Sequence, residues 1–138
     1  MIRSRNHGFT LIEVMVAIAI VGILSFLAVY MFQTYSSKAK VSAGVSELKS
    51  LSIRYDALHV GGNGNPSLAD LEVNDSNRCK FSMKSALADE VSIACELVSV
   101  SGSIVGGILT YSRSADGRWK CSANAVLASD VLPMDCKL

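Results

Sequence analysis

The sequence predicts an α+β fold, in which one long N-terminal helix packs on an antiparallel sheet of about four strands. Three observations support this prediction. Residues 9–32 are almost wholly apolar, residues 33–60 repeat apolar side chains at helical spacing, and residues 91–138 contain alternating, strand-like runs. A chain of 138 residues is long enough for one small domain.

The overall composition excludes two broad classes of protein. Half of the residues are hydrophobic, 18% are charged and the formal net charge is +1. A disordered chain would have low hydrophobicity and high net charge, and a generally basic nucleic-acid-binding protein would have a larger positive charge. The average combines an apolar segment, residues 9–32, with a polar remainder that is rich in Ser and Gly.

The apolar segment reads FTLIEVMVAIAIVGILSFLAVYMF and contains one charged residue, Glu13. As a helix it would be about 36 Å long, which exceeds the roughly 30 Å hydrocarbon core of a bilayer. It is too long for a cleaved secretory signal and is followed by no small-residue cleavage site. Because Arg3 and Arg5 precede it, we expect the N-terminal end to stay cytoplasmic and the C-terminal part to be exported.

Glu13 is unusual because a carboxylate inside a membrane-spanning helix is costly and generally serves a function with a partner. No Lys, Arg or His occurs between Phe9 and Phe32. The partner of Glu13 must therefore come from another chain or from a charge created after synthesis. The alternative interpretation is a plain single-span anchor.

The helical pattern continues beyond the apolar segment as an amphipathic stretch. No strong helix breaker intervenes, so one helix is predicted from about Thr10 to about His59, with a length of about 75 Å. The Gly- and Asn-rich cluster at residues 61–66 ends it. The apolar stripe is predicted to form the face on which the sheet packs: Val41, Val45, Leu48, Leu51, Tyr55 and Leu58.

Residues 61–90 are predicted to be a connecting region with one short helix over Ser67–Leu71, in which Ser67 is the N-cap. The sheet follows in residues 91–138. Strand-like alternation over residues 91–97 precedes a turn at Ser101-Gly102. A hairpin is then predicted from residues 108–114 and 118–122 around Ala115-Asp116-Gly117, and a short strand or ordered tail over about 130–137.

Four cysteines, Cys79, Cys95, Cys121 and Cys136, allow three pairings, and the residues alone do not choose among them. Export to an oxidising compartment favours disulfides. The sequence has no CxxC pair and only two histidines, so no zinc or other metal site is predicted. No cofactor is predicted either.

No catalytic constellation is readable, so we expect a protein that is not an enzyme. His59 is isolated at the predicted helix end, and His7 lies before the apolar segment. No GxSxG motif occurs, and Gly61–Gly64 lacks the following Lys-Ser/Thr of a phosphate-binding loop.

The run Gly8-Phe9-Thr10-Leu11-Ile12-Glu13 resembles the cleavage and methylation motif of type IV prepilins, including the short basic leader before it. The resemblance implies that residues 1–8 are a leader peptide, that a prepilin peptidase cuts between Gly8 and Phe9, and that Phe9 is N-methylated. The new amine of Phe9 would supply the missing partner of Glu13, in a neighbouring subunit, and the pair would set the register of assembly.

A second resemblance lies near the C-terminus. Gly117-Arg118-Trp119-Lys120-Cys121, Leu132-Pro133 and Cys136, with the preceding TYSRSADG, are similar to the C-terminal disulfide loop of type IVa major pilins of the Pseudomonas kind. This similarity implies a type IV pilin roll and a Cys121–Cys136 bond, which leaves Cys79–Cys95 as the second bond.

The resemblance implies a structural subunit of a type IV pilus. Such a subunit is an inner-membrane precursor that polymerises with other subunits into an extracellular fimbrium, through the helix of residues 9–32, and supports adhesion, twitching motility or DNA uptake. Major pilins often have Pro where this chain has Tyr30, and that Pro marks a weak place in the helix. Its absence is more usual in minor pilins, so a minor or competence-type pilin is an alternative. A secretion-system pseudopilin is less consistent with a two-Cys terminal loop.

Two contact surfaces are predicted. The C-terminal loop, residues 122–135, is a candidate receptor-binding region through Ser122, Asn124, Ser129 and Asp130. DNA is the other candidate partner. Loss of Arg3 and Arg5 leaves 11 basic against 12 acidic residues, a net charge of −1 that disfavours strong nonspecific DNA binding. The candidate DNA contacts are Arg113, Arg118 and Lys120 on the hairpin, with Arg78, Lys80 and Lys84 around Cys79.

Overall fold

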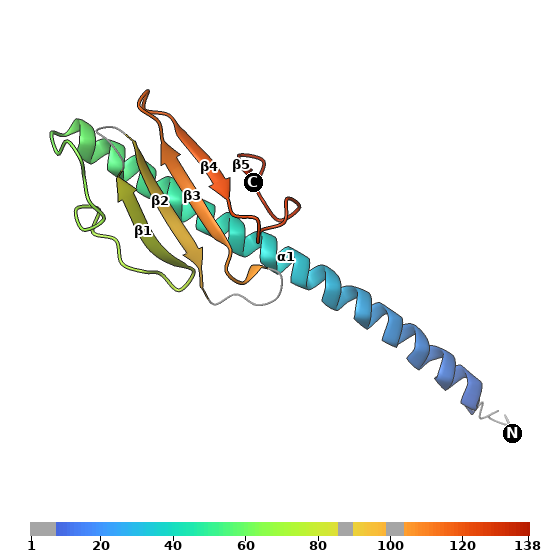
Figure 1. The fold of residues 1–138 in the computed structure, drawn as a ribbon. Coiled ribbons are helices and arrows are strands. Elements are labelled where there is room, and N and C mark those ends of the chain that lie inside the picture. Colours follow the sequence, from blue (N-terminus) through green and yellow to red (C-terminus); the bar gives the residue numbers. More distant parts are fainter. Residues whose placement is uncertain (1–7, 86–89, 99–103) are drawn as a thin grey trace, which may run out of the picture. The chain divides into compact units, whose positions relative to one another are not determined.

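The computed structural model describes residues 8–85, 90–98 and 104–138 (Figure 1). The chain divides into two compact units, Met1–Tyr35 and Ser36–Leu138, and we call the second unit the head. The elements are helix α1 (Leu11–Val60) and strands β1 (Cys79–Ser85), β2 (Val91–Leu97), β3 (Ile108–Arg113), β4 (Trp119–Ala123) and β5 (Cys136–Lys137).

Helix α1 has 50 residues and runs through both units, as the unbroken helical pattern predicts. It ends where the chain reaches Gly61-Gly62. The Gly61 N–H donates to the Ala57 carbonyl at 3.0 Å, and Gly62 has a φ of +102°, which L-residues rarely adopt. The glycines therefore stop the helix and turn the chain toward the connection.

The head contains one five-stranded sheet with strand order β1-β2-β3-β4-β5. The first three pairings are antiparallel, and β4 pairs with β5 in parallel. The predicted hairpin is formed by β3 and β4, with Gly117 at a φ of +78° in the turn. In the predicted tail, only Cys136–Lys137 is a strand, and the preceding residues form turns. The predicted turn at Ser101-Gly102 lies outside the described residues.

Two features of the connecting region differ from the prediction. Strand β1 lies inside residues 61–90, where no strand was predicted, although Cys79, Phe81 and Met83 alternate with polar residues that are more exposed. The predicted short helix over Ser67–Leu71 is replaced by hydrogen-bonded turns, in which the Leu71 N–H donates to the Ser67 carbonyl at 3.2 Å and the Glu72 N–H to the Ala69 carbonyl at 3.0 Å. Two backbone hydrogen bonds are too few to propagate as a helix.

The hydrophobic core of the head lies between α1 and the inner face of the sheet. Gly44 allows the two layers to approach closely, because a Cβ atom there would lie 3.0 Å from Leu109 Cδ1 and 3.1 Å from Leu97 Cδ2. The predicted apolar stripe of α1 is the buried face of the helix. Among the fully buried side chains are Val41 and Leu48 of α1, Ile93 of β2, Leu109 of β3 and Leu71 of the connection.

Candidate functional site

The N-terminal end of α1 is closed by Thr10 and Glu13. The Thr10 N–H and hydroxyl each donate to Glu13 Oε2 at 2.8 Å, and the Glu13 N–H donates to Thr10 Oγ1 at 3.3 Å. This is the capping box that the pattern Thr-x-x-Glu forms at helix starts. For Glu13 an assembly role was predicted from the sequence, and this local capping role was not. The two bonds that the Glu13 carboxylate accepts both end on Oε2, and Oε1 makes no hydrogen bond to another described residue.

The apolar segment is exposed throughout. Every residue from Gly8 to Gln33 is exposed, including Phe9 at 88% and Phe32 at 70%. Helix α1 contains an apolar window that is long enough to cross a membrane. An open depression of about 360 Å³ lies beside Glu13 and is lined by Ile12, Val16, Ala17 and Ile20. This surface can be removed from water only by lipid or by other chains.

The four cysteines form two disulfides in the head. Cys79 and Cys95 join β1 to β2 with a Cα–Cα distance of 5.0 Å, and Cys121 and Cys136 join β4 to β5 at 4.6 Å. This is the pairing that the resemblance to type IVa pilins implies. Each bond closes a loop of 15 or 16 residues, which corresponds to about 3 kcal/mol in the chain-entropy model.

The C-terminal loop, residues 122–135, has a buried side and an exposed side. Leu127 and Val131 are buried and anchor the loop in the core. Asn124 fixes the loop to the segment before β3, because Nδ2 donates to the Gly106 carbonyl at 2.9 Å and Oδ1 accepts from the Ile108 N–H at 3.1 Å. Of the four candidate receptor residues, Asn124 is therefore engaged within the head. The other three, Ser122, Ser129 and Asp130, are exposed.

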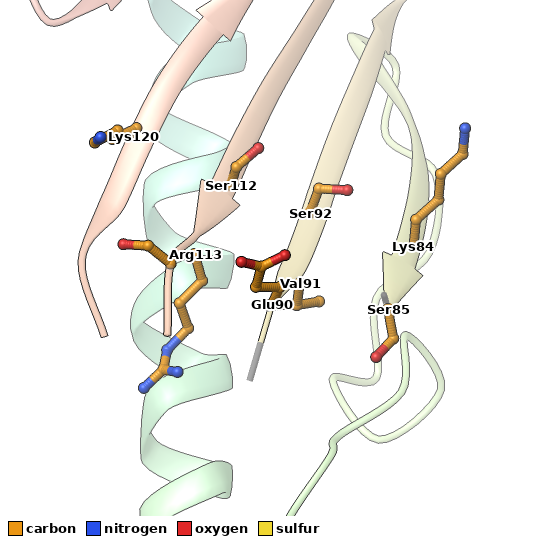
Figure 2. Close-up of a pocket in the computed structure, with 9 residues that line it drawn as sticks. Lys84, Ser85, Glu90, Val91, Ser92, Ser112, Arg113 and Lys120 are labelled. Carbon is orange, nitrogen blue, oxygen red and sulfur yellow. The ribbon is translucent and has the colours of Figure 1, made fainter. Parts of the chain in front are cut away.

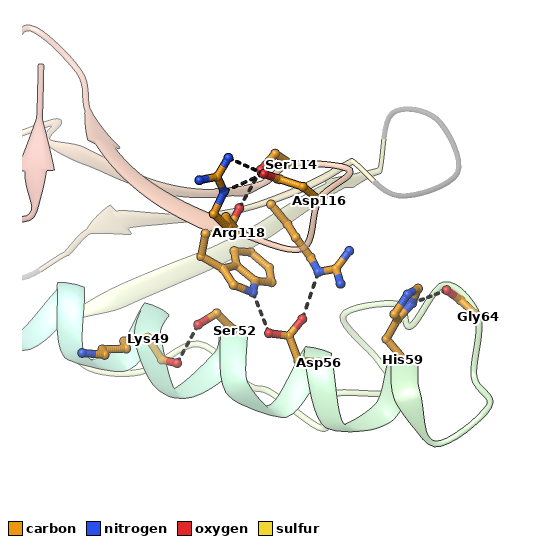
Figure 3. A network of polar contacts seen from close by, with 10 residues as sticks. Lys49, Ser52, Asp56, His59, Gly64, Ser114, Asp116 and Arg118 are labelled. Atoms are coloured by element: carbon orange, nitrogen blue, oxygen red, sulfur yellow. Dashed lines mark hydrogen bonds and ion pairs between the residues drawn. The ribbon is translucent and has the colours of Figure 1, made fainter.

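Arg113, a candidate DNA contact, is bound to the helix. Its Nε donates to Asp56 Oδ1 at 2.9 Å, and its side chain is only 12% exposed. The other carboxylate oxygen of Asp56 accepts from the Trp119 indole N–H at 2.8 Å. Figure 3 shows both bonds reaching Asp56 on α1 from the sheet. Asp56 thus connects α1 to both arms of the hairpin.

Two more of the candidate cations have acidic partners. Arg118 pairs with Asp116 at 2.5 Å, and the Ser114 hydroxyl donates to the same carboxylate (Figure 3). These two contacts, the hydroxyl first, lower the pKa of Asp116 to about 2. Arg78 pairs with Glu47 of α1 at 3.1 Å. Arg113 and Arg118 therefore have acidic partners, whereas Lys120 forms no ion pair with another described residue.

Asp56 and Trp119 are structural residues that our sequence reasoning missed. Their positions in the sequence pattern gave only a weak indication of this role. Asp56 directly follows Tyr55 of the apolar stripe, and Trp119 alternates with Lys120 along β4. Asp56 reaches the indole and the Arg113 guanidinium, while the Tyr55 ring lies edge-on to the Trp119 ring at 5.7 Å. Pairwise contacts of this kind depend on the packing of helix on sheet.

Two family models match the chain. The prokaryotic N-terminal methylation motif matches residues 3–29, and the pilin model, described as a bacterial filament family, matches residues 37–137. The second match covers most of the chain, so this protein belongs to the bacterial pilin family. It is a type IV fimbrial subunit, and pilins are structural subunits rather than enzymes.

Curated relatives extend over most of the chain. It is 33% identical over 130 residues to a fimbrial protein of Pseudomonas aeruginosa, covering 84% of each chain. It is 31% identical to fimbrial protein Q of Moraxella bovis, over 97% of this chain and 99% of that one. A probable minor fimbrial protein of Dichelobacter nodosus is 27% identical over 97% and 96% of the two chains.

The fold is also similar to that of a solved structure. A Cs1 pilin chimera superposes with a TM-score of 0.60 at 17% identity, covering 75% of this chain and 98% of that chain. At this identity the likeness concerns the fold alone. It agrees with the predicted architecture of a long helix on a mostly antiparallel sheet.

Proposed function

We propose that this pilin is cleaved between Gly8 and Phe9 by a prepilin peptidase, N-methylated on Phe9, and polymerised through residues 9–32 into an extracellular pilus. The observation that supports this most directly is the exposed apolar surface of that segment. An apolar surface on all sides suits a bilayer and also a bundle of like helices. The same residues would thus anchor the precursor in the inner membrane and later form the centre of the fibre.

Glu13 would set the register of the subunits. A protonated Phe9 amine on a neighbouring subunit, offset slightly along the fibre, would be the partner of the carboxylate. Four helical residues span about 6 Å, so a small axial offset between subunits brings the two groups together. Because Oε2 already receives both Thr10 donors, Oε1 is the oxygen that would accept the amine. A subunit in the wrong register would leave two charges unpaired in an apolar surrounding.

Adhesion through residues 122–135 is the activity of the assembled pilus that the head supports best. Ser122, Ser129 and Asp130 are exposed, while buried Leu127 and the Cys121–Cys136 bond hold the loop in place. A role in DNA uptake through Arg113, Arg118 and Lys120 has less support, because the first two are paired with acidic side chains. Twitching motility and a minor-subunit role both remain compatible with the fold.

The register proposal is tested by comparing Glu13→Gln with Glu13→Ala. Glutamine keeps an oxygen that can accept the Thr10 bonds but carries no charge, whereas alanine removes both. In cells that also express wild-type subunits, we expect both variants to insert in the membrane normally. Both should enter sheared fibres about tenfold less often than wild type, because both lack the charge that pairs with the neighbour's amine.

The readout is mass spectrometry of sheared surface fibres, which also reports cleavage at Gly8 and methylation of Phe9. Thr10→Ala is the matched control, since it weakens the cap but keeps the carboxylate. It should enter fibres nearly as well as wild type. Normal incorporation of Glu13→Gln would show that capping, rather than charge, is the function of Glu13.

A further inference from the structure

An open groove of about 600 Å³ lies on the outer face of the sheet, which is the face away from α1 (Figure 2). Alternation along the strands places the buried residues on the inner face and the polar residues on this one. The strand registers align four groove residues in one row across the sheet. The row is Lys84 of β1, Ser92 of β2, Ser112 of β3 and Lys120 of β4.

The two lysines at the ends of the row are its cationic groups. Three strand spacings of about 4.8 Å separate their backbones by about 14 Å. Both lysines are exposed, and neither forms an ion pair with another described residue. Arg113 also lines the groove but is bound to Asp56, and Glu90 contributes one carboxylate at the end of the groove. Among the described residues that line it, the groove therefore offers two ammonium groups without an acidic partner against one carboxylate.

Hydroxyl groups fill the space between the lysines. Ser92 and Ser112 belong to the row itself, and each hydroxyl can both donate and accept a hydrogen bond. In the next row along the same face, three of the four residues also carry hydroxyls. That row is Ser82 of β1, Ala94 of β2, Thr110 of β3 and Ser122 of β4. A ligand that complements this face carries many hydroxyls and has anionic groups spaced along it.

From these contacts we infer that the outer face of the sheet binds an acidic polysaccharide, with Lys84 and Lys120 receiving carboxylates or sulfates and the row of serines receiving sugar hydroxyls. Nucleic acid is the less suitable polyanion. Of the described residues that line the groove, none is aromatic and able to stack on a base. Two lysines also provide little countercharge for a duplex that carries one charge per about 1.7 Å.

Polymerisation into a pilus, which is the proposed function, would repeat the groove along the fibre. In a filament the groove would occur once per subunit, and a polysaccharide repeats its acidic groups along its length. Many weak contacts on one chain can then act together, which raises the avidity far above the affinity of a single groove. A single groove therefore needs only a weak affinity for its oligosaccharide.

The test begins with the full-length protein in neutral detergent, so that it does not depend on filament formation. A fluorescent hyaluronan oligosaccharide is titrated with protein, and binding is followed by anisotropy. A neutral dextran oligosaccharide of equal length and a DNA duplex serve as competing probes. We expect hyaluronan to bind with a Kd in the millimolar range or tighter, and dextran and DNA to bind more weakly.

The double variant Lys84→Gln, Lys120→Gln should weaken hyaluronan binding about tenfold, because both charge-assisted contacts are lost. Ser92→Ala with Ser112→Ala should weaken it about fivefold without changing the net charge. The matched control is Lys38→Gln with Lys49→Gln, which removes the same charge from exposed positions of α1 and should leave binding unchanged.

Three results would overturn the inference: no binding of hyaluronan, equal loss in the control variant, or tighter binding of the DNA duplex. A second measurement uses sheared fibres and long hyaluronan. If the detergent-solubilised subunit binds hyaluronan but is absent from sheared fibres, the groove proposal stands and the filament proposal is contradicted. The two hypotheses thus fail by different observations.

Discussion

The two units of this pilin place their apolar side chains in opposite environments. In residues 9–32 the large apolar side chains are all exposed, whereas Leu48, Ile93 and Leu109 of the head are fully buried. A single helix, α1, supplies residues to both units. Helical propensity is therefore not what distinguishes them. The difference is that the head contains its own sheet to pack against, while the N-terminal segment needs lipid or other subunits.

Two glycines of α1 illustrate the same contrast. A Cβ atom at Gly44 would lie in tight contact with Leu109 and Leu97, at 3.0 and 3.1 Å, whereas nothing lies within 4 Å of a Cβ built at Gly22. The head also has bonds that the N-terminal segment lacks among the described residues: two disulfides, and the Asp56 contacts to Arg113 and Trp119. The head is thus specified by internal contacts, and the segment by its surroundings.

The strongest test of this comparison truncates one leucine in each unit. Leu48→Ala should lower the free energy of unfolding of the head by about 2–5 kcal/mol, because it leaves a cavity in the core. Leu24→Ala, at a position that is 60% exposed, should change it by less than about 0.5 kcal/mol. Urea unfolding in neutral detergent, followed by the fluorescence of Trp119, the sole tryptophan, measures both.

An equal loss of stability in the two leucine variants would show that the segment and the head unfold as one unit. Ile53→Ala provides a control within the head. This side chain is 65% exposed although it belongs to the same helix, so its truncation should resemble that of Leu24.

The glycine pair gives an effect of opposite sign at the two positions. Gly44→Ala should destabilise the head by about 1–3 kcal/mol, since the new methyl group overpacks the contact with β2 and β3. Gly22→Ala should instead stabilise the helix by up to about 1 kcal/mol, because alanine is the better helix former and meets open space. Trp119 fluorescence reports the first change, and helical circular dichroism during heating reports the second. Destabilisation by Gly22→Ala would indicate a close contact that the isolated chain does not have.

The smallest expected effect is a pH dependence of stability that comes from the β3–β4 turn of the head. The pKa of Asp116 is lowered from 3.8 to about 2 by the Ser114 hydroxyl and by Arg118. Since the folded-state pKa is the lower one, the turn contributes stability that is fully present above about pH 4. That contribution is lost as the pH falls toward 2.

Carboxyl chemical shifts in an NMR titration measure the pKa of Asp116 directly. Ser114→Ala should raise this pKa toward 3.8, because the first of the two contacts is lost. An unchanged pKa for Asp116 in the variant would contradict the assignment of the cause.

Much of the architecture could be predicted from local patterns. Helix α1, strand β2 and the β3–β4 hairpin all follow from periodicity and from glycines at the required turns. Strand β1 was missed because it is an edge strand whose inner residues, Phe81 and Met83, are only partly buried. Strand β5 is too short for a periodic signal, and its pairing with β4 joins segments that are separated in the sequence.

Some candidate sites can likewise be predicted from the sequence, and others depend on the fold. The Gly8–Phe9 motif and Glu13 are adjacent in sequence, so their combination is readable without a structure. The basic residues of the hairpin are not, because sequence proximity grouped Arg113 and Arg118 with Lys120, while the fold gives the first two acidic partners. It also aligns Lys120 with Lys84, which is 36 positions away in the chain.

By itself, the sequence determined the helix, its apolar and amphipathic halves, the N-terminal motif and the class of protein. These depend on residue type and on spacing within one turn or one strand. Only the tertiary structure decided which cations are neutralised, which face of the sheet carries the groove and where Asp56 bonds. Such contacts join residues from different strands and from α1, and their partners are chosen by strand register and by the packing of helix on sheet.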